Sequence, residues 1–210
     1  MARHDPDPHV ERLAAFIAAS PSPHHAVATA ASMLSAGGFT GLKASEVSVG
    51  VGRGFTLRNG SLVAWSVPPG WRPGDGFRLI GAHTDSPGWR VRPQPDTGGF
   101  GYRQLALEPY GGLLVNSWLD RDLGLAGIVV LDGGDGTTAT QLLDTGGAVM
   151  RIPQLAIHLD RDVNERGLQL NKQTHMVPVT GLGDPHGGLF VDQLASRCGV
   201  DPGRVIAWDL

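Results

Sequence analysis

A histidine and an aspartate lie two positions apart directly after a short apolar run, and this pair could hold a metal ion. The run covers residues 77–82, ends in Gly81 and Ala82, and is followed at once by His83 and Asp85. Because side chains two apart in an extended chain point the same way, both can face one site at the carboxyl end of a strand. A neutral imidazole can bind zinc, and a neighbouring carboxylate can fix its tautomer. The pattern is typical of a metallohydrolase.

The spacing alone does not establish a metal site, because a histidine at a strand end is commonly a polar surface or capping residue. The surrounding sequence favours the metal. Small residues before His83 allow close approach, and Pro87 and Gly88 break the chain soon after it, as expected at a sheet edge. The single cysteine, Cys198, excludes an internal disulfide and a cysteine-cluster zinc site, so a metal would be held by His, Asp and Glu.

Two further segments carry side chains that could do chemistry. Asp120 and Asp122 lie beside an apolar stretch and could bridge a metal pair, but turn hydrogen bonds and an ion pair explain them more simply. Residues 155–159 alternate between apolar and other side chains and predict a strand, with His158 on the face opposite the leucines. His158 is therefore expected outside the core, either as a surface histidine or in a functional role.

The elements that must position His83 and Asp85 precede them in the chain. Apolar residues at helical spacing predict one helix over about residues 10–17 and a second from Pro23 to Gly37. The dipeptide Asn59-Gly60, between two β-rich runs, predicts a hairpin. With the strand that leads to His83, this part of the chain is expected to form an α/β unit.

The sequence pattern changes beyond residue 95, where short apolar runs are separated by glycine-rich turns. We expect strands over residues 105–107, 113–115, 127–131, 148–152, 155–159 and 177–179. Helical signal returns only near residues 190–196 and after Asp201. We therefore place a domain boundary at about residue 95, between an α/β part (1–95) and a mostly β part (96–210).

Composition limits the classes of protein that need to be considered. A chain of 210 residues with 41% hydrophobic content and a net charge of -3 is typical of a soluble protein with one sizeable or two small domains. It has no basic stripe for nucleic acid and no run near the roughly 20 apolar residues that span a membrane. The first residues lack the apolar centre of a secretion signal, which favours a cytoplasmic location.

Five segments, read together, closely resemble the aspartyl aminopeptidase family of zinc metallopeptidases. They are SPSPHHAV (20–27), FRLIGAHTDSPGWRVRP (77–93), EPYGGLLVNSWLDRDLGLAG (108–127), RIPQLAIHLDRDVNERG (151–167) and HMVPV (175–179). Their order and spacing cover nearly the whole chain. The resemblance implies a cytosolic, homo-oligomeric enzyme that removes aspartate or glutamate from the amino termini of peptides.

The resemblance also implies a fold and roles for particular residues. In this family a proteolytic α/β domain is interrupted by a β-rich dimerisation domain. The resemblance therefore implies the fold class α/β, with a partial zinc-peptidase domain followed by a mostly β dimerisation or lid domain. His83 matches a zinc (Zn2+) ligand, and Asp85 matches the catalytic-site acid that accompanies it. His158 matches a histidine of the inserted domain, associated with the zinc site and able to reach a neighbouring subunit. Asp120 matches the inserted domain and not the family's metal-bridging aspartate.

The sequence departs from the family in its length. Members are about twice as long, and their second half supplies a bridging Asp, a Glu-Glu pair, a further Asp and a last His. Glutamates occur here only at positions 11, 46, 108 and 165, and none is adjacent to another. Because zinc catalysis needs at least three protein ligands and a general base, we expect this chain alone to bind zinc weakly and to show no peptidase activity.

Three hypotheses follow from this departure. The chain represents an aminopeptidase of this family, truncated so that most of the catalytic site is missing. Alternatively, it is a non-catalytic oligomerisation module derived from that family. A third hypothesis is a related zinc amidohydrolase that acts on acylated amino acids.

Overall fold

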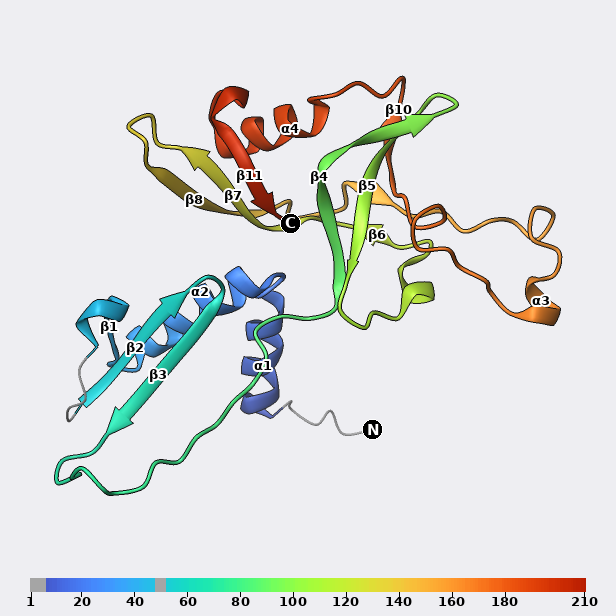
Figure 1. Cartoon of the computed structure of the whole chain (residues 1–210). Coiled ribbons are helices and arrows are strands. Elements are labelled where there is room, and N and C mark those ends of the chain that lie inside the picture. Colours follow the sequence, from blue (N-terminus) through green and yellow to red (C-terminus); the bar gives the residue numbers. More distant parts are fainter. Residues whose placement is uncertain (1–6, 48–51) are drawn as a thin grey trace. The chain divides into compact units, whose positions relative to one another are not determined.

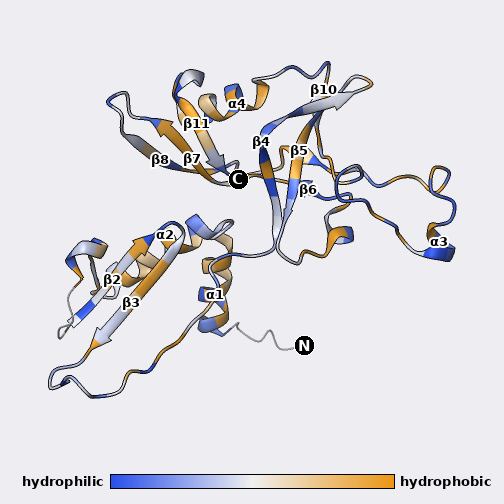
Figure 2. Ribbon diagram, in the orientation of Figure 1, coloured by the Kyte–Doolittle hydropathy of each residue, from blue (hydrophilic) through white to orange (hydrophobic). Residues whose placement is uncertain are grey.

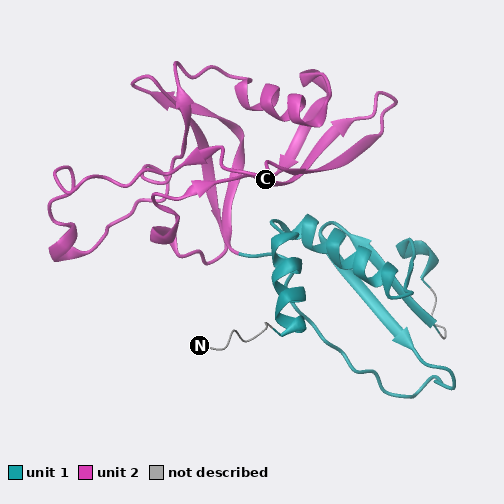
Figure 3. Cartoon of the chain, turned by 180° about the vertical axis from the view of Figure 1, so that it is seen from behind, with its two compact units in different colours: residues 1–86 teal, residues 87–210 magenta. Residues whose placement is uncertain are grey.

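The computed structural model describes residues 7–47 and 52–210, and the chain divides into two compact units (Figure 3). Unit 1 comprises residues 1–86 and unit 2 comprises residues 87–210. Helices and several separate sheets occur together, which confirms a mixed α/β fold. No described helix has the length and apolar character needed to cross a membrane.

Two helices open unit 1 (Figure 1) and confirm both predicted helices. They are α1 (Pro8–Ala18) and α2 (Pro23–Ala36). Side-chain oxygens of Asp7 and Ser22 cap them by accepting hydrogen bonds from backbone N–H groups of the first turn. Helix α2 ends before Gly38, whose φ of 81° is readily adopted by glycine. The apolar stripe that predicts α1 remains exposed, because α1 contains no buried residue.

A three-stranded sheet follows the helices. Its strands are β1 (Thr40–Gly41), β2 (Gly52–Arg58) and β3 (Ser61–Val67), in the order β1-β2-β3, with a short 3₁₀ helix η1 (Ala44–Glu46) after β1. Strand β1 runs parallel to β2, and β2 pairs with β3 along its full length. Asn59 and Gly60 both have positive φ, 46° and 74°, as a tight two-residue hairpin turn requires. The predicted hairpin is confirmed.

The predicted strand before His83 is not formed. Residues 77–82 have no regular secondary structure, and the sheet of unit 1 ends at β3. A strand needs a neighbour to accept and donate its backbone hydrogen bonds, and no described segment takes this role for residues 77–82. The apolar run is therefore present in the sequence without the partner that would make it a strand.

Unit 2 contains two sheets, three short helices that lie between strands, and one longer helix. Its elements are β4 (Gly88–Gly99), β5 (Tyr102–Tyr110), η2 (Val115–Trp118), β6 (Asp122–Leu123), β7 (Ala126–Asp132), β8 (Thr138–Asp144), β9 (Met150–Arg151), α3 (Val163–Arg166), β10 (Val179–Leu182), α4 (Leu189–Cys198), η3 (Pro202–Arg204) and β11 (Val205–Asp209). One sheet has the order β4-β5-β10-β9-β6 and the other β11-β7-β8.

Of the six strands predicted for unit 2, two are found, two overlap a strand only in part (148–152 with β9 and 177–179 with β10), and two are wrong. Residues 105–107 and 127–131 lie inside β5 and β7, and the predicted helix near residues 190–196 is α4. Residues 113–115 and 155–159 form no strand. The latter segment turns back on itself, since the N–H groups of Leu159 and Asp160 both donate to the carbonyl of Ala156. A short alternating pattern without a neighbouring strand is not enough to keep the backbone extended.

The predicted boundary near residue 95 lies within β4, whereas the two units divide after Ser86. The register of β4 against β5 shifts between Val91 and Asp96, and Pro93 and Pro95 lie in this irregular stretch. Proline cannot donate a ladder hydrogen bond, so it is accommodated at a bulge. These prolines interrupt the pairing of one strand, so the change of sequence pattern near residue 95 does not mark the division between the units.

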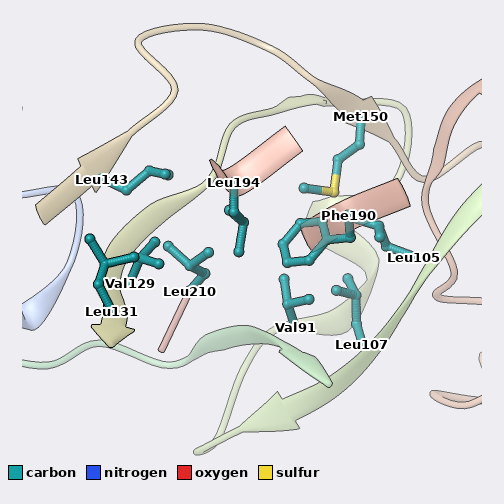
Figure 4. Close-up of a cluster of buried hydrophobic side chains, with 10 residues drawn as sticks. All are labelled: Val91, Leu105, Leu107, Val129, Leu131, Leu143, Met150, Phe190, Leu194 and Leu210. Atoms are coloured by element: carbon teal, nitrogen blue, oxygen red, sulfur yellow. The ribbon is translucent and has the colours of Figure 1, made fainter. Parts of the chain in front are cut away.

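The main core of unit 2 lies between the two sheets and α4 (Figure 4). Buried side chains from β4, β5, β7, β8 and α4 meet there, and Phe190 of α4 packs edge-on against Trp208 with ring centres 5.3 Å apart. The sheets also meet through the backbone, because Val91 N–H donates to the carbonyl of Leu210 at 2.9 Å. Unit 2 therefore has a hydrophobic core of its own.

Candidate metal site

The structure brings His83 and Asp85 together as their spacing predicts. His83 Nδ1 and Asp85 Oδ1 are 2.9 Å apart, within hydrogen-bond distance. An ionised carboxylate can only accept, so the imidazole donates from Nδ1 and presents the lone pair of Nε2 outwards. This is the tautomer in which a histidine binds a metal through Nε2 while a carboxylate orients the ring.

The pair lies on the surface of unit 1. The His83 side chain is 89% exposed, while that of Asp85 is 34% exposed. A polar contact with this much exposure contributes at most about 1 kcal/mol to stability, so it orients the ring without burying it. The histidine is therefore accessible to a metal ion and to further ligands.

Two contacts hold the chain within and before the pair. The Thr84 hydroxyl donates to the carbonyl of Gly60, 2.8 Å away, in the turn between β2 and β3. Trp71 and Phe77 pack with their ring centres 5.3 Å apart. The sequence pattern did not identify Thr84 as a positioning residue, because its partner lies in another part of the chain. Only the Asn59-Gly60 signal could have located the turn to which it is bound.

The donor types of this pair suit zinc, but their number does not complete a zinc site. Imidazole nitrogen and carboxylate oxygen are both zinc donors, and protein zinc sites use at least three protein ligands. Among residues 7–47 and 52–210, no three His, Cys, Asp or Glu side chains are grouped so that they could hold a metal ion. The His83–Asp85 pair thus offers at most two donors toward such a site.

His158, the other predicted metal ligand, lies in unit 2 on the long connection between β9 and β10 (Figure 1). Its side chain is exposed, which agrees with its predicted place outside the core. It belongs to no group of three or more metal-binding side chains among the described residues. Its role as a ligand stays a prediction.

The aspartates that could bridge a metal pair are engaged in structural contacts. Asp120, with a positive φ of 52°, accepts a hydrogen bond from Gln154 N–H at 3.2 Å. Asp122 pairs with Arg151 on the neighbouring strand β9, at 2.7 Å. These contacts confirm the simpler interpretation of turn hydrogen bonds and an ion pair.

Comparison with known protein families identifies the family of the chain that contains the His83–Asp85 pair. The family described as "Aminopeptidase I zinc metalloprotease (M18)" matches residues 16–210. The chain belongs to the M18 family. A probable M18 family aminopeptidase 2 from Streptomyces coelicolor is 48% identical over 204 residues, which cover 96% of this chain and 46% of that protein.

Solved M18 structures have the same fold as this chain. The mApe1 structure from Chaetomium thermophilum superposes with a TM-score of 0.83 at 30% identity, covering 97% of this chain and 50% of that one. The S. cerevisiae mApe1 dodecamer superposes with a TM-score of 0.77 at 28% identity, covering 96% and 47%. This M18 chain therefore spans about half the length of the relatives that it matches.

Proposed function

We propose that this chain forms part of a zinc-dependent aminopeptidase that releases aspartate or glutamate from the amino termini of peptides. The observation that carries the proposal is the His83–Asp85 contact, found in a chain that matches the M18 family from residue 16 to residue 210. Further metal ligands and the general base would come from protein outside the described residues.

The proposal gives each candidate residue a role. His83 binds zinc through Nε2, and Asp85, as the companion acid of the catalytic site, holds the imidazole in the tautomer that exposes this nitrogen. His158 joins the zinc site across a subunit interface of a homo-oligomer. The dodecamer of the yeast relative supports an oligomer of this kind. A cytoplasmic location stays a prediction from the sequence.

A covalent fusion tests this function directly. Residues 1–210 would be joined to the part of the Streptomyces coelicolor relative that this chain does not span, and the fusion would be loaded with zinc. We expect release of p-nitroaniline from aspartyl- and glutamyl-p-nitroanilide at rates well above those for the leucyl and lysyl compounds. His83→Ala should abolish turnover, whereas His9→Ala, in α1, should retain it. A folded, zinc-loaded fusion without acidic aminopeptidase activity would contradict the proposal, and hydrolysis of N-acetyl amino acids alone would favour an amidohydrolase.

A second candidate function is that of a non-catalytic oligomerisation module. Two observations favour it. Unit 2 has a hydrophobic core of its own, and no three metal-binding side chains are grouped among the described residues. Sedimentation of the 210-residue chain would show a stable oligomer that does not depend on zinc. An inactive fusion together with such an oligomer would favour this candidate over the enzyme.

A further inference from the structure

We propose that Asn59 is a site of spontaneous covalent modification, at which deamidation to isoaspartate opens the turn between β2 and β3 and releases the His83–Asp85 segment from that turn. This modification goes beyond the proposed function, because Asn59 is not among the residues assigned to zinc or to catalysis. The residue that reacts, its nucleophile and the contact that restrains them all lie in unit 1.

The sequence after Asn59 supplies the nucleophile. Asn59 is followed by glycine, which has no side chain to hinder approach to its backbone nitrogen. The other asparagines are followed by serine, glutamate and lysine; they are Asn116, Asn164 and Asn171. In an Asn-Gly sequence the backbone nitrogen of the glycine can attack the side-chain amide carbon of the asparagine. Asn59 is therefore the asparagine of this chain with the least hindered nucleophile.

The reaction consumes one water molecule and produces ammonia. The nitrogen of Gly60 forms a bond to Cγ of Asn59, the Cγ–Nδ2 bond breaks, and the side-chain nitrogen leaves as ammonia with the proton of the Gly60 amide. Water then opens the cyclic imide, giving its hydroxyl to a carbonyl carbon and its proton to the Gly60 nitrogen. Attack at Cγ yields aspartate. Attack at the backbone carbonyl carbon yields isoaspartate, in which the main chain continues through Cβ and Cγ.

The turn that contains this sequence lies outside the strand ladder. Asn59 is exposed, and the last residues that pair across the hairpin are Arg58 and Ser61. Figure 2 shows hydrophobic colouring along β3 but not at the turn before it, so the turn can open while the apolar side chains of β3 stay in place. Local openings of this kind cost little free energy. They give the Gly60 nitrogen the freedom to reach Cγ of Asn59, which the closed two-residue turn restricts.

A hydrogen bond from outside the hairpin couples this turn to the candidate metal site. The hydroxyl of Thr84 donates to the carbonyl of Gly60 at 2.8 Å, and Thr84 lies between His83 and Asp85. The bond holds Gly60 in the closed turn and so slows the attack. Isoaspartate lengthens the main chain by one carbon atom, so a two-residue turn of this geometry no longer closes. The Gly60 carbonyl then leaves Thr84, and the His83–Asp85 segment loses its tie to the hairpin.

Incubation of the 210-residue chain at neutral pH tests the site, with peptide mass spectrometry and labelling by an isoaspartyl methyltransferase as the readouts. We expect isoaspartate to accumulate faster at Asn59 than at any other asparagine in the same sample. Thr84→Val, which removes an exposed hydroxyl donor, should speed the loss of Asn59 about two- to tenfold, because one hydrogen bond that holds the turn is lost. Thr29→Val removes a hydroxyl bond to the carbonyl of Ala19 in the same unit and should leave the rate unchanged.

The effect on the metal pair is measured by NMR. The deamidated fraction, isolated by ion exchange through its additional negative charge, is compared with Asn59→Asp, which carries the same charge on an ordinary backbone. We expect a second set of amide resonances for residues 83–85 in the deamidated fraction that Asn59→Asp does not show. Resonances identical to those of Asn59→Asp would overturn the coupling to the metal pair. Absence of isoaspartate at Asn59, or a rate for Thr84→Val no higher than for Thr29→Val, would overturn the modification site and its restraint.

Discussion

Removal of the Asp96 carboxylate should destabilise α4 and the core that it covers. Asp96 lies on β4, after the bulge, and its two oxygens accept hydrogen bonds from the N–H groups of Gly188 and Phe190 at 3.0 and 3.1 Å. These groups begin α4, where backbone N–H groups have no partner within the helix. The carboxylate thus caps a helix that is distant in the sequence.

The size of the effect follows from these two contacts. Replacement of a capping side chain by alanine costs about 0.5–2 kcal/mol, and loss of a negative charge at a helix amino terminus adds about 0.3–1 kcal/mol. Because the carboxylate accepts two hydrogen bonds, we expect Asp96→Ala to lower the free energy of unfolding by about 2 kcal/mol. Asp96→Asn keeps one acceptor oxygen and should cost about half as much.

Native-state hydrogen exchange in α4 measures this free energy without the assumption that both units unfold together. A loss of about 2 kcal/mol corresponds to roughly 30-fold faster exchange of the α4 amides. The matched control is Asp144→Ala, which removes one exposed hydrogen bond to Gly146 N–H in the turn after β8. Exchange in α4 that is no faster for Asp96→Ala than for Asp144→Ala would refute the capping argument.

Two further predictions concern zinc and the single thiol. A structural zinc site with four ligands contributes about 10–16 kcal/mol. In the isolated chain Asp85 orients the ring and His83 is the ligand, so about a quarter of that free energy predicts a Kd of about 1–15 mM for zinc, measured by NMR titration. His83→Ala should weaken this binding and His9→Ala should not; nanomolar affinity in the 210-residue chain would mean that more ligands are present than the described residues show. Burial raises the pKa of the Cys198 thiol, so less thiolate is present at pH 8 and iodoacetamide should react more slowly with the folded chain than with the chain in urea. The difference should narrow as the pH rises past the raised pKa, and equal rates at pH 8 would show that the thiol is not shielded.

Much of the fold follows from local sequence signals. The helices α1 and α2 are recognisable from apolar residues at helical spacing, and the hairpin from Asn59 and Gly60, because each feature depends on residues within a few positions of one another. The His83–Asp85 contact belongs to the same class, since two residues on one side of an extended chain need no distant partner in order to meet. These predictions required no knowledge of the tertiary structure.

A strand needs a neighbouring strand, and a metal site needs further ligands. A local sequence pattern does not show whether either is present. The alternation at residues 155–159 and the apolar run at 77–82 both suit a strand, yet neither has a neighbouring strand among the described residues. The sequence pattern changes near residue 95, although pairing with β5 on both sides of the bulge makes these residues part of β4.

The sequence by itself determined the family resemblance, the helices, the hairpin and the types of metal donor, because these depend on residue identity and close spacing. Only the tertiary structure decided where the units divide, which aspartates are held in ion pairs and turns, how Asp96 caps α4, and that His83 and Asp85 have no third ligand within the described chain. The physical reason is that a strand, a distant cap and a metal site each need a partner from elsewhere in the protein, and only the folded chain shows which partners are present.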